Sequence, residues 1–306
     1  MLAWLRRRVS RAYERLLARE VDGAPAHVAV IQDGNRRYAR ERGGDAHDGH
    51  RAGAETTEDV LQWCADLGVA ELTLYTFSTE NEARPADERE RLFDLLAEKL
   101  REFADAERVH AEGIRIRAIG DVERLPARVR DAVDYAERRT AGHDDFVLNV
   151  AVGYGGRTEL LRAVRDVARD VAVGDLDPDG VGVDTVEERL HGDEVRDVDL
   201  IIRTGGDERT SNFLPWHANG NEAAAVFCAP YWPGFSKADF LRAIRTYERR
   251  EESWRRARAR RALALLRAFG GAELAEARSV LQRFREHLPS GEAAEVAEEQ
   301  ETPAAD

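Results

Sequence analysis

The sequence predicts an α/β fold, a single domain with a central, mostly parallel six-stranded sheet flanked by helices. Three observations support this prediction. From Pro25 onward, six short apolar runs alternate with longer stretches of helical periodicity. Strand and helix in alternation are typical of a parallel sheet that is covered on both faces. The 306 residues can bury a large core, and the composition favours one large domain over two small ones.

The individual elements follow from apolar periodicity and from the turn residues between them. Strands are predicted at residues 27–31, 71–77, 114–119, 146–152, 199–203 and 224–227. Helices are predicted at residues 49–67, 87–112, 126–139, 158–171 and 183–191. Residues 171–184 are rich in Gly, Asp and Pro, which favours a surface loop.

Two segments flank the predicted domain, which is expected to span residues 25–288. Residues 1–24 carry apolar side chains at helical spacing and arginines on the other faces, so a basic amphipathic helix is expected. Such a helix suits an anionic membrane surface, but packing on its own domain or dimer gives the same pattern, so both interpretations stay open. Beyond a largely helical stretch from residue 237, residues 289–306 are acidic and small, which is typical of a disordered tail.

Charge and composition bound the environment and the partners. The formal net charge is -13, and Lys99 and Lys237 are the only lysines among 46 basic residues. This pattern fits a halophilic cytoplasm, although a GC-rich genome alone would also replace lysine by arginine. The acidic sum argues against a nucleic-acid partner. With no apolar run of membrane-spanning length and no secretory signal, the expected location is the cytoplasm, either free or peripheral at the inner face of the cell membrane.

A loop dense in polar groups directly follows the first predicted strand, with the sequence Asp33-Gly34-Asn35-Arg36-Arg37. In an open α/β sheet, ligands bind beyond the carboxyl ends of the strands. Gly34 lets the backbone approach an anion closely, and the two arginines add positive charge. Asp33 makes sense among these cations chiefly if Mg²⁺ lies between it and a phosphate. The alternative is an aspartate that only caps the next helix.

A second loop of the same kind, residues 203–212, follows the predicted strand at 199–203. It holds two arginines, hydroxyl groups and two glycines, and arginine forks suit phosphate oxygens. Two such loops suggest two diphosphates. A third strand ends in a polar stretch, residues 78–85, where Ser78 and Thr79 are either ligand contacts or simple turn formers.

These motifs together resemble a known enzyme family. The segments HVAVIQDGNRRYA, GHRAG, LTLYTFSTENEARP, NVAVGYGGR and IIRTGGDERTSNFLPW match the cis-prenyltransferases, the undecaprenyl diphosphate synthase family, in order and spacing over roughly residues 27–250. The resemblance implies a homodimeric, Mg²⁺-dependent transferase that adds isopentenyl diphosphate units to an allylic diphosphate, either geranylgeranyl or farnesyl diphosphate. The expected product is a long-chain polyprenyl diphosphate, the precursor of a glycosyl carrier lipid.

The resemblance also implies roles for individual residues. Asp33 would hold Mg²⁺ and promote departure of the allylic diphosphate, while a second metal carboxylate, Glu222, would be donated across the dimer. Asn81 would lie where the condensing unit loses a proton. The family's allylic diphosphate contacts fall on Gly34, Asn35, Arg36, Arg37, Tyr38 and His50. The residues around Asn81 are Ser78, Thr79, Glu80 and Arg84, and those of the isopentenyl site are Arg203, Arg209, Thr210 and Ser211.

Several details refine this expectation. The Arg-Arg-Tyr sequence after Asn35 is more similar to archaeal and eukaryotic members than to most bacterial ones, and with the salt signature it points to a haloarchaeal enzyme. A family Arg-x-Gly near the carboxyl end is not found, and Arg267-Ala-Phe-Gly270 is the nearest match. A non-catalytic partner subunit of such an enzyme is the main alternative, but it would be expected to lose one of the two loops. A nucleotide-binding or phosphatase domain would instead predict motifs that the sequence lacks.

Overall fold

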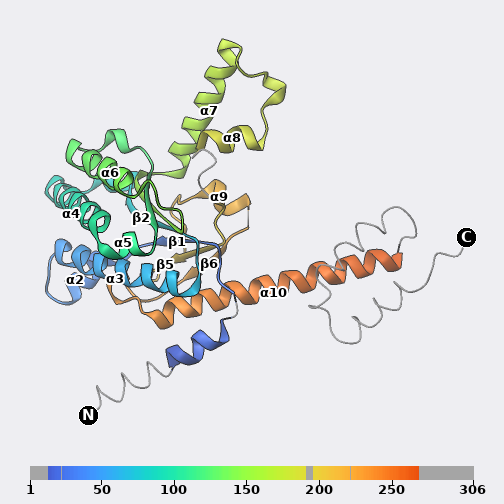
Figure 1. Ribbon diagram of the computed structural model, residues 1–306, viewed down its shortest axis with the longest axis horizontal. Coiled ribbons are helices and arrows are strands. Elements are labelled where there is room, and N and C mark those ends of the chain that lie inside the picture. The colour runs from blue at the N-terminus through green and yellow to red at the C-terminus, as the bar shows by residue number, and fades with distance from the viewer. Residues whose placement is uncertain (1–12, 22, 191–195, 221, 269–306) are drawn as a thin grey trace, which may run out of the picture. The chain divides into compact units, whose positions relative to one another are not determined.

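The computed structural model describes residues 13–21, 23–190, 196–220 and 222–268 (Figure 1). Six strands form one sheet in the order β3-β4-β2-β1-β5-β6, and every neighbouring pair is parallel. The strands are β1 (His27–Ile31), β2 (Glu71–Ser78), β3 (Ile114–Ile119), β4 (Phe146–Tyr154), β5 (Leu200–Arg203) and β6 (Ala224–Phe227). The predicted α/β fold and its six strands are confirmed, and the sheet is parallel throughout.

All five predicted helices are present, although several bounds differ. The helices are α2 (Asn35–Glu41), α3 (Ala46–Leu67), α4 (Ala86–Asp105), α5 (Glu107–Ala111), α6 (Ala127–Thr140), α7 (Gly156–Val173), α8 (Val183–Leu190), α9 (Pro215–Gly220) and α10 (Lys237–Ala268). The single helix predicted at residues 87–112 is in fact two, because Ala106 adopts an extended conformation with ψ 128° and ends α4. The short helix α2 was not predicted.

Helix α3 begins earlier than predicted because its amino end is capped. Asp45 accepts a hydrogen bond from the Asp48 backbone N–H, and the Asp48 side chain accepts one from the Asp45 backbone. This reciprocal capping satisfies two backbone donors that a helix end leaves unpaired. The cap fixes where α3 starts, and the first turns of α3 lie next to the polar loop that follows β1.

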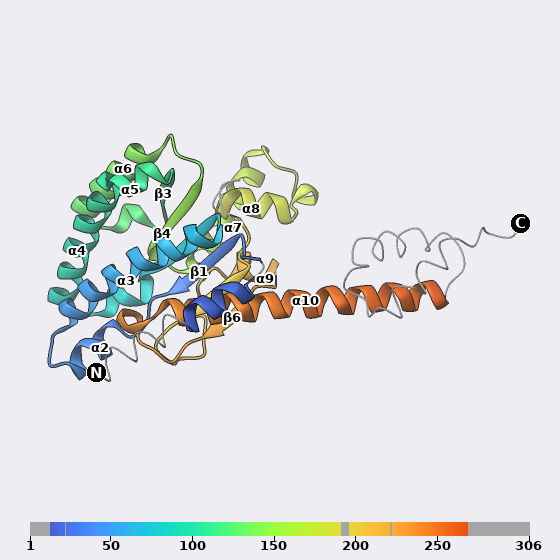
Figure 2. The ribbon, with the colours of Figure 1, turned by 60° about the horizontal axis from the view of Figure 1, so that its bottom comes forward.

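The centre of the sheet is buried on both faces. Val28, Ala29 and Val30 of β1 are fully buried, although successive side chains of a strand point to opposite faces. The two faces are therefore both covered, as expected for parallel strands. The described residues up to Ile244 form one compact unit that contains the whole sheet, and the described residues from Arg245 onward belong to a second unit. Helices α7 and α8 make a hairpin that projects away from the sheet (Figures 1 and 2).

The described part of the amino-terminal segment packs on its own domain. Residues 13–20 form a helix that lies beside the start of α10 (Figure 2). Its Leu17 is buried against Ala238 and Leu241. The Arg242 guanidinium lies 5.3 Å from the ring centroid of Tyr13. Of the two interpretations left open by the sequence, packing thus accounts for this part of the helix. None of the described helices is long and apolar enough to cross a membrane.

A buried polar network joins the amino ends of the central strands. His27 is fully buried, and its Nδ1 donates to the Arg196 carbonyl at 2.7 Å while its Nε2 accepts from the Thr73 hydroxyl at 2.7 Å. The Asn149 amide donates to the same Thr73 hydroxyl at 3.0 Å. Since the carbonyl can only accept, the proton of the neutral ring sits on Nδ1. Burial lowers the pKa of His27, an effect that the charge of Glu71 only partly offsets.

We expect this histidine to destabilise the protein in mild acid. Because the pKa of His27 is lower in the folded chain, the unfolded chain binds the proton first as pH falls, and stability decreases below about pH 6.5. Thermal unfolding at fixed salt should therefore show a melting temperature that falls between pH 7 and pH 5. The variant His27→Gln should be less stable at pH 7 but should lose less on acidification. An unchanged pH slope in that variant would contradict the assignment.

Candidate active site

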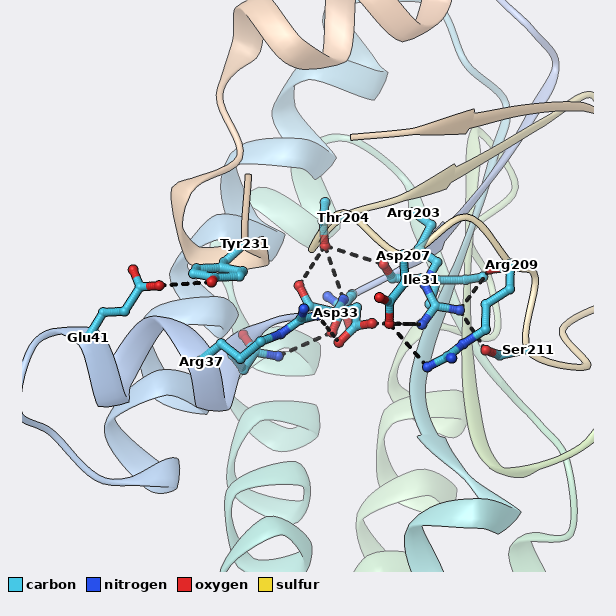
Figure 3. A network of polar contacts seen from close by, with 12 residues as sticks. Ile31, Asp33, Arg37, Glu41, Arg203, Thr204, Asp207, Arg209, Ser211 and Tyr231 are labelled. Atoms are coloured by element: carbon cyan, nitrogen blue, oxygen red, sulfur yellow. Dashed lines mark hydrogen bonds and ion pairs between the residues drawn. The ribbon is translucent and has the colours of Figure 1, made fainter. Parts of the chain in front are cut away.

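The site lies where the carboxyl ends of β1 and β5 meet (Figure 3). These strands are neighbours in the sheet, with Ile31 paired in register with Arg203. Asp33 follows β1 by two residues, so the topology brings it next to Arg203. The Nη2 atom of Arg203 donates to Oδ2 of Asp33 at 2.7 Å. The structure thus unites the two loops that the sequence singled out, although 170 residues separate them in the chain.

Asp33 is held as a carboxylate between two guanidinium groups. Its Oδ1 atom lies 3.2 Å from Nη2 of Arg37, and its side chain is 28% exposed. Burial raises the pKa of Asp33, but the hydrogen bond and charge of Arg203 and the charge of Arg37 outweigh it and lower that pKa. The backbone around it is fixed as well, because the Thr204 hydroxyl accepts from the Asp33 N–H at 3.0 Å and donates to the Asp33 carbonyl at 2.8 Å. The sequence did not indicate this role for Thr204.

Arg203 is the most buried cation of the site and links its parts. Its side chain is only 4% exposed. Besides Asp33, its guanidinium donates to the Arg209 carbonyl at 2.7 Å and to the Ser211 hydroxyl at 2.5 Å. Ser211 and Asn212 have left-handed φ angles of 49° and 59°, which are uncommon for residues other than glycine. This turn folds the loop back so that Ser211 faces the arginine.

A second group of charges lies around Glu88, a residue that was not predicted from the sequence. Arg84 donates to the Glu88 carboxylate at 2.9 Å, and Arg36 lies 3.6 Å from the same oxygen. The Nη1 atom of Arg84 lies 3.4 Å from Nε2 of His50. Burial lowers the pKa of His50, and its Nδ1 donates to the Ala46 carbonyl. His50 is therefore a neutral side chain that contacts the Arg84 guanidinium, and it does not add to the positive charge of the site.

Asn81 lies in the short helical turn Thr79–Ala83, which follows β2. Its Oδ1 atom accepts a hydrogen bond from the Ser78 N–H at 3.0 Å. Ser78 and Asn81 thus cap this turn reciprocally, and they still line the same cavity as Asp33. Ser78 is therefore a turn former that also lines the cavity, and its role as a ligand contact stays a prediction.

A cavity of about 320 Å³ extends from these polar groups along helices α3 and α4. Its polar part contains ten of the predicted residues, namely Asp33, Asn35, His50, Ser78, Glu80, Asn81, Arg84, Arg203, Arg209 and Ser211. Its apolar wall is made chiefly by Leu74, Leu92, Leu95, Leu96, Leu100, Phe103, Ile116, Leu148 and Val150. Gln32, Thr57 and Trp232 also line it and were not predicted. The result is an anion site that continues directly into an apolar pocket.

Other predicted residues lie outside this lining. Gly34 directly follows Asp33 in the chain, and Nη2 of Arg37 lies 3.2 Å from the Asp33 carboxylate. Tyr38 lies under the Arg42 guanidinium, 3.6 Å from ring centroid to carbon. Thr79 borders Gly155, where an added Cβ would lie 2.6 Å from the Thr79 hydroxyl, and Thr210 is exposed.

Glu222 lies at the other end of the sheet. Phe227 pairs in register with Arg203, and Glu222 precedes Phe227 by five residues. Ala224, the first residue of β6, pairs with Leu200 at the amino end of β5, and Glu222 lies in the turn before it, whereas Arg203 lies at the carboxyl end of β5. One chain alone therefore does not unite Glu222 with Asp33. The nearest match to the family's Arg-x-Gly is Arg267-Ala-Phe-Gly270, and its Gly270 lies outside the described residues.

Comparison with known proteins decides the family. The family described as "Putative undecaprenyl diphosphate synthase" matches residues 31–255, which is more than half of the chain. The chain belongs to this family of prenyltransferases. The resemblance read from the motifs is thereby confirmed, and with it the assignment as an enzyme that transfers prenyl groups and makes a polyprenyl diphosphate.

Relatives of this prenyltransferase cover nearly all of its length. A protein of Halobacterium salinarum is 70% identical over 92% of both chains, and one of Haloarcula marismortui is 62% identical over 94% of this chain and 95% of the relative. Both are named tritrans,polycis-undecaprenyl-diphosphate synthase (geranylgeranyl-diphosphate specific). The expectation of a haloarchaeal type of enzyme is borne out by these similarities.

Two solved structures share the fold of this prenyltransferase. Lavandulyl diphosphate synthase from Lavandula x intermedia, in complex with dimethylallyl diphosphate, has a TM-score of 0.67 and 31% sequence identity, and it is matched over 73% of this chain and 95% of its own. A probable undecaprenyl diphosphate synthase from Campylobacter jejuni has a TM-score of 0.60 at the same identity and coverage.

Proposed function

We propose that this prenyltransferase extends geranylgeranyl diphosphate with isopentenyl diphosphate to an undecaprenyl-length product, using Mg²⁺. The observation that carries the proposal is the continuity of the site, in which an arginine-rich polar end opens into a cavity walled by leucines. A substrate with a diphosphate head and an isoprenoid tail matches this site, because its charged head fits the polar end and its apolar tail fits the leucine-lined part. The names of the two haloarchaeal relatives support geranylgeranyl diphosphate as the primer.

The two diphosphates would bind to separate arginine groups. The allylic diphosphate would lie over the turn formed by Asp33 and Gly34, with Arg37 beside it. The isopentenyl diphosphate would contact Arg203, Arg209 and Ser211, which lie together at the end of β5. Guanidinium groups suit phosphate because they offer paired N–H donors in a plane.

The carboxylate of Asp33 fits a magnesium ion that arrives with the substrate. Among the described residues, no cluster of three or more carboxylate, histidine or cysteine ligands exists that could hold a metal by itself. Mg²⁺ is commonly bound by one or two carboxylates together with substrate phosphates, and Asp33 is kept ionised beside the proposed phosphate positions. Bound there, the ion would neutralise charge on the departing diphosphate. We propose Glu222 of a second copy as a further ligand.

The protein's own groups would orient the reaction. Arg37 and Arg203 stabilise negative charge that develops on the leaving diphosphate, a contribution that is largest where water is excluded. The Asn81 oxygen is already engaged by the Ser78 N–H, so its amide N–H₂ is the part left to donate to a phosphate oxygen. An amide is a poor base, and the proton lost from the condensing unit would therefore pass to diphosphate oxygen that Asn81 holds in place.

The enzyme would act as a homodimer. The projecting hairpin exposes Leu161, Val164 and Val183, and the edge strand β6 exposes Phe227. Such exposed apolar side chains suit contact with a second copy, and the dimer would also be needed to bring Glu222 to an Asp33. We further propose that the amino-terminal helix contacts the inner face of the cell membrane. Leu16 of this helix is 53% exposed, so its apolar side chain could insert into the membrane surface.

Filling the apolar wall should shorten the product. An engineered cavity of about 150 Å³ holds one benzene, so the 320 Å³ here is small for a growing polyprenyl chain, and added bulk should block it. Leu100→Trp is expected to shift the product distribution to shorter chains while initiation continues. The matched control Arg101→Trp places the same side chain on the exposed side of α4. Chromatographic sizing of the lipids would measure both, and equal product lengths would rule out this wall as the chain's path.

The function itself is tested by direct turnover. Purified protein in high KCl with Mg²⁺ and labelled isopentenyl diphosphate would be given either farnesyl or geranylgeranyl diphosphate. We expect long polyprenyl products with a preference for the geranylgeranyl primer. No incorporation with either primer, in protein shown to be folded, would favour the non-catalytic partner subunit.

A further inference from the structure

The loop that follows β6 is tied to both halves of the diphosphate site. The Gly205 N–H donates to the Pro230 carbonyl at 2.7 Å, and the Trp232 N–H donates to the Asp33 carbonyl at 2.9 Å. Tyr231 lies between these two anchors. Its backbone position is therefore fixed relative to the Asp33 turn on one side and to the loop after β5 on the other.

The Tyr231 side chain lies across one turn of α2 (Figure 3). Its hydroxyl donates to Oε1 of Glu41 at 2.8 Å, and its ring centroid lies 5.2 Å from the guanidinium carbon of Arg37. Arg37 and Glu41 are four residues apart, so they occupy the same face of the helix. A guanidinium within about 6 Å of an aromatic centroid is attracted by the ring. The bond to Glu41 raises the pKa of the Tyr231 phenol, so the phenol stays protonated at neutral pH and remains a donor.

Two glycines make the space that this arrangement needs. An added Cβ at Gly34, whose φ is +99°, would lie 2.6 Å from Cδ1 of Tyr231. An added Cβ at Gly205 would lie 2.7 Å from Nη2 of Arg37. Arg37 is thus confined between the Tyr231 ring, the Gly205 backbone and the Asp33 carboxylate, which is 3.2 Å away. The arginine is 40% exposed, so few other contacts restrict it.

We infer that Tyr231 is a positioning residue for the allylic diphosphate, because its ring holds Arg37 against the Asp33 turn. The inference rests on the proposed function, in which Arg37 contacts that diphosphate. Tyr231 itself need not touch the substrate. An arginine already confined loses less side-chain freedom when it binds phosphate, so removal of the ring weakens binding at this site. The isopentenyl diphosphate contacts Arg203 and not Arg37 in the proposed function, so its binding should be unaffected by removal of the Tyr231 ring.

Kinetics of single and double variants test this role. Tyr231→Leu is expected to raise the KM for geranylgeranyl diphosphate about 3- to 10-fold and to leave the KM for isopentenyl diphosphate unchanged. Tyr231→Phe keeps the ring and should stay within about 2-fold of the parent. In an Arg37→Ala background, which has a raised KM of its own, Tyr231→Leu should add nothing further. Tyr13→Leu, which removes the distant ring beside Arg242, serves as the matched control with unchanged kinetics.

Several outcomes would overturn the inference. It fails if Tyr231→Leu matches the parent, if the phenylalanine variant is as impaired as the leucine variant, or if the leucine effect persists in full without Arg37. Should Tyr231→Leu not fold, as judged by its melting temperature, Tyr231→Met replaces it in the same comparison. Failure of the proposed function looks different, because the unmodified protein would then show no turnover and no calorimetric binding of geranylgeranyl diphosphate.

Discussion

Replacement of Asp33 by alanine is expected to lower kcat by about 10³-fold or more while the protein remains folded. The carboxylate lies between Arg37 and Arg203 at the proposed leaving group. Its loss removes the metal contact, the carboxylate beside Arg37 and one of the two carboxylates that pair with Arg203, the other being Asp207. Little apolar packing is lost, because the side chain is partly exposed and makes polar contacts.

The stability cost of Asp33→Ala should be modest. Arg203 is almost fully buried and would lose its partner at 2.7 Å, but the Arg209 carbonyl, the Ser211 hydroxyl and Asp207 remain. Loss of one such partner costs about 1–3 kcal/mol. Steady-state turnover and thermal unfolding would be measured on the same preparation. Asp33→Asn is the companion variant, since it keeps the shape of the side chain while it removes the charge and replaces one acceptor oxygen by an amide donor. Substantial activity in both variants would refute the assigned role of Asp33.

Replacement of Arg203 by methionine should lower kcat/KM for both substrates by about 10² to 10³-fold. Methionine fills similar space and removes a buried charge, so the effect should come from lost donors more than from lost packing. The guanidinium bridges Asp33 on one side and Ser211 on the other. Both halves of the site should therefore lose their alignment together.

Two comparisons sharpen the Arg203 experiment. Arg203→Lys keeps the charge but not the planar fork, and it should recover only part of the activity. Arg209→Met removes a neighbouring guanidinium whose side chain is 67% exposed, and it should raise mainly the KM for isopentenyl diphosphate. If Arg203→Met affected only one of the two substrates, the bridging role would be wrong. Separate substrate titrations for each variant decide this.

The sequence predicted the sheet well because its strands are short apolar runs bounded by turn residues. It missed α2, since residues 35–41 are mostly polar and show no apolar period. It also joined α4 to α5, because helical periodicity continues across Ala106 even though the backbone does not. Local patterns reveal which residues favour helix, and they do not reveal where tertiary contacts bend the chain.

The centre of the site was predictable for a topological reason. Parallel strands bring their carboxyl ends to one edge, so the loops at Asp33 and Arg203 had to be neighbours once β1 and β5 paired. Glu88 and Tyr231 were not predictable, because their roles depend on helix and loop contacts that no motif encodes. The neutral state of His50 likewise follows from burial and from the Ala46 carbonyl, which only the fold supplies.

The pairing of β1 with β5 also has a consequence for biosynthesis. β1 is made early, but the strand that covers one of its edges begins at Leu200. At about 5–20 residues per second, the ribosome needs roughly 10–30 s to supply it. During that interval the nascent chain exposes an unpaired apolar strand edge, which is prone to aggregation. The diphosphate ligands cannot protect this edge during that interval, because Arg203 has yet to emerge.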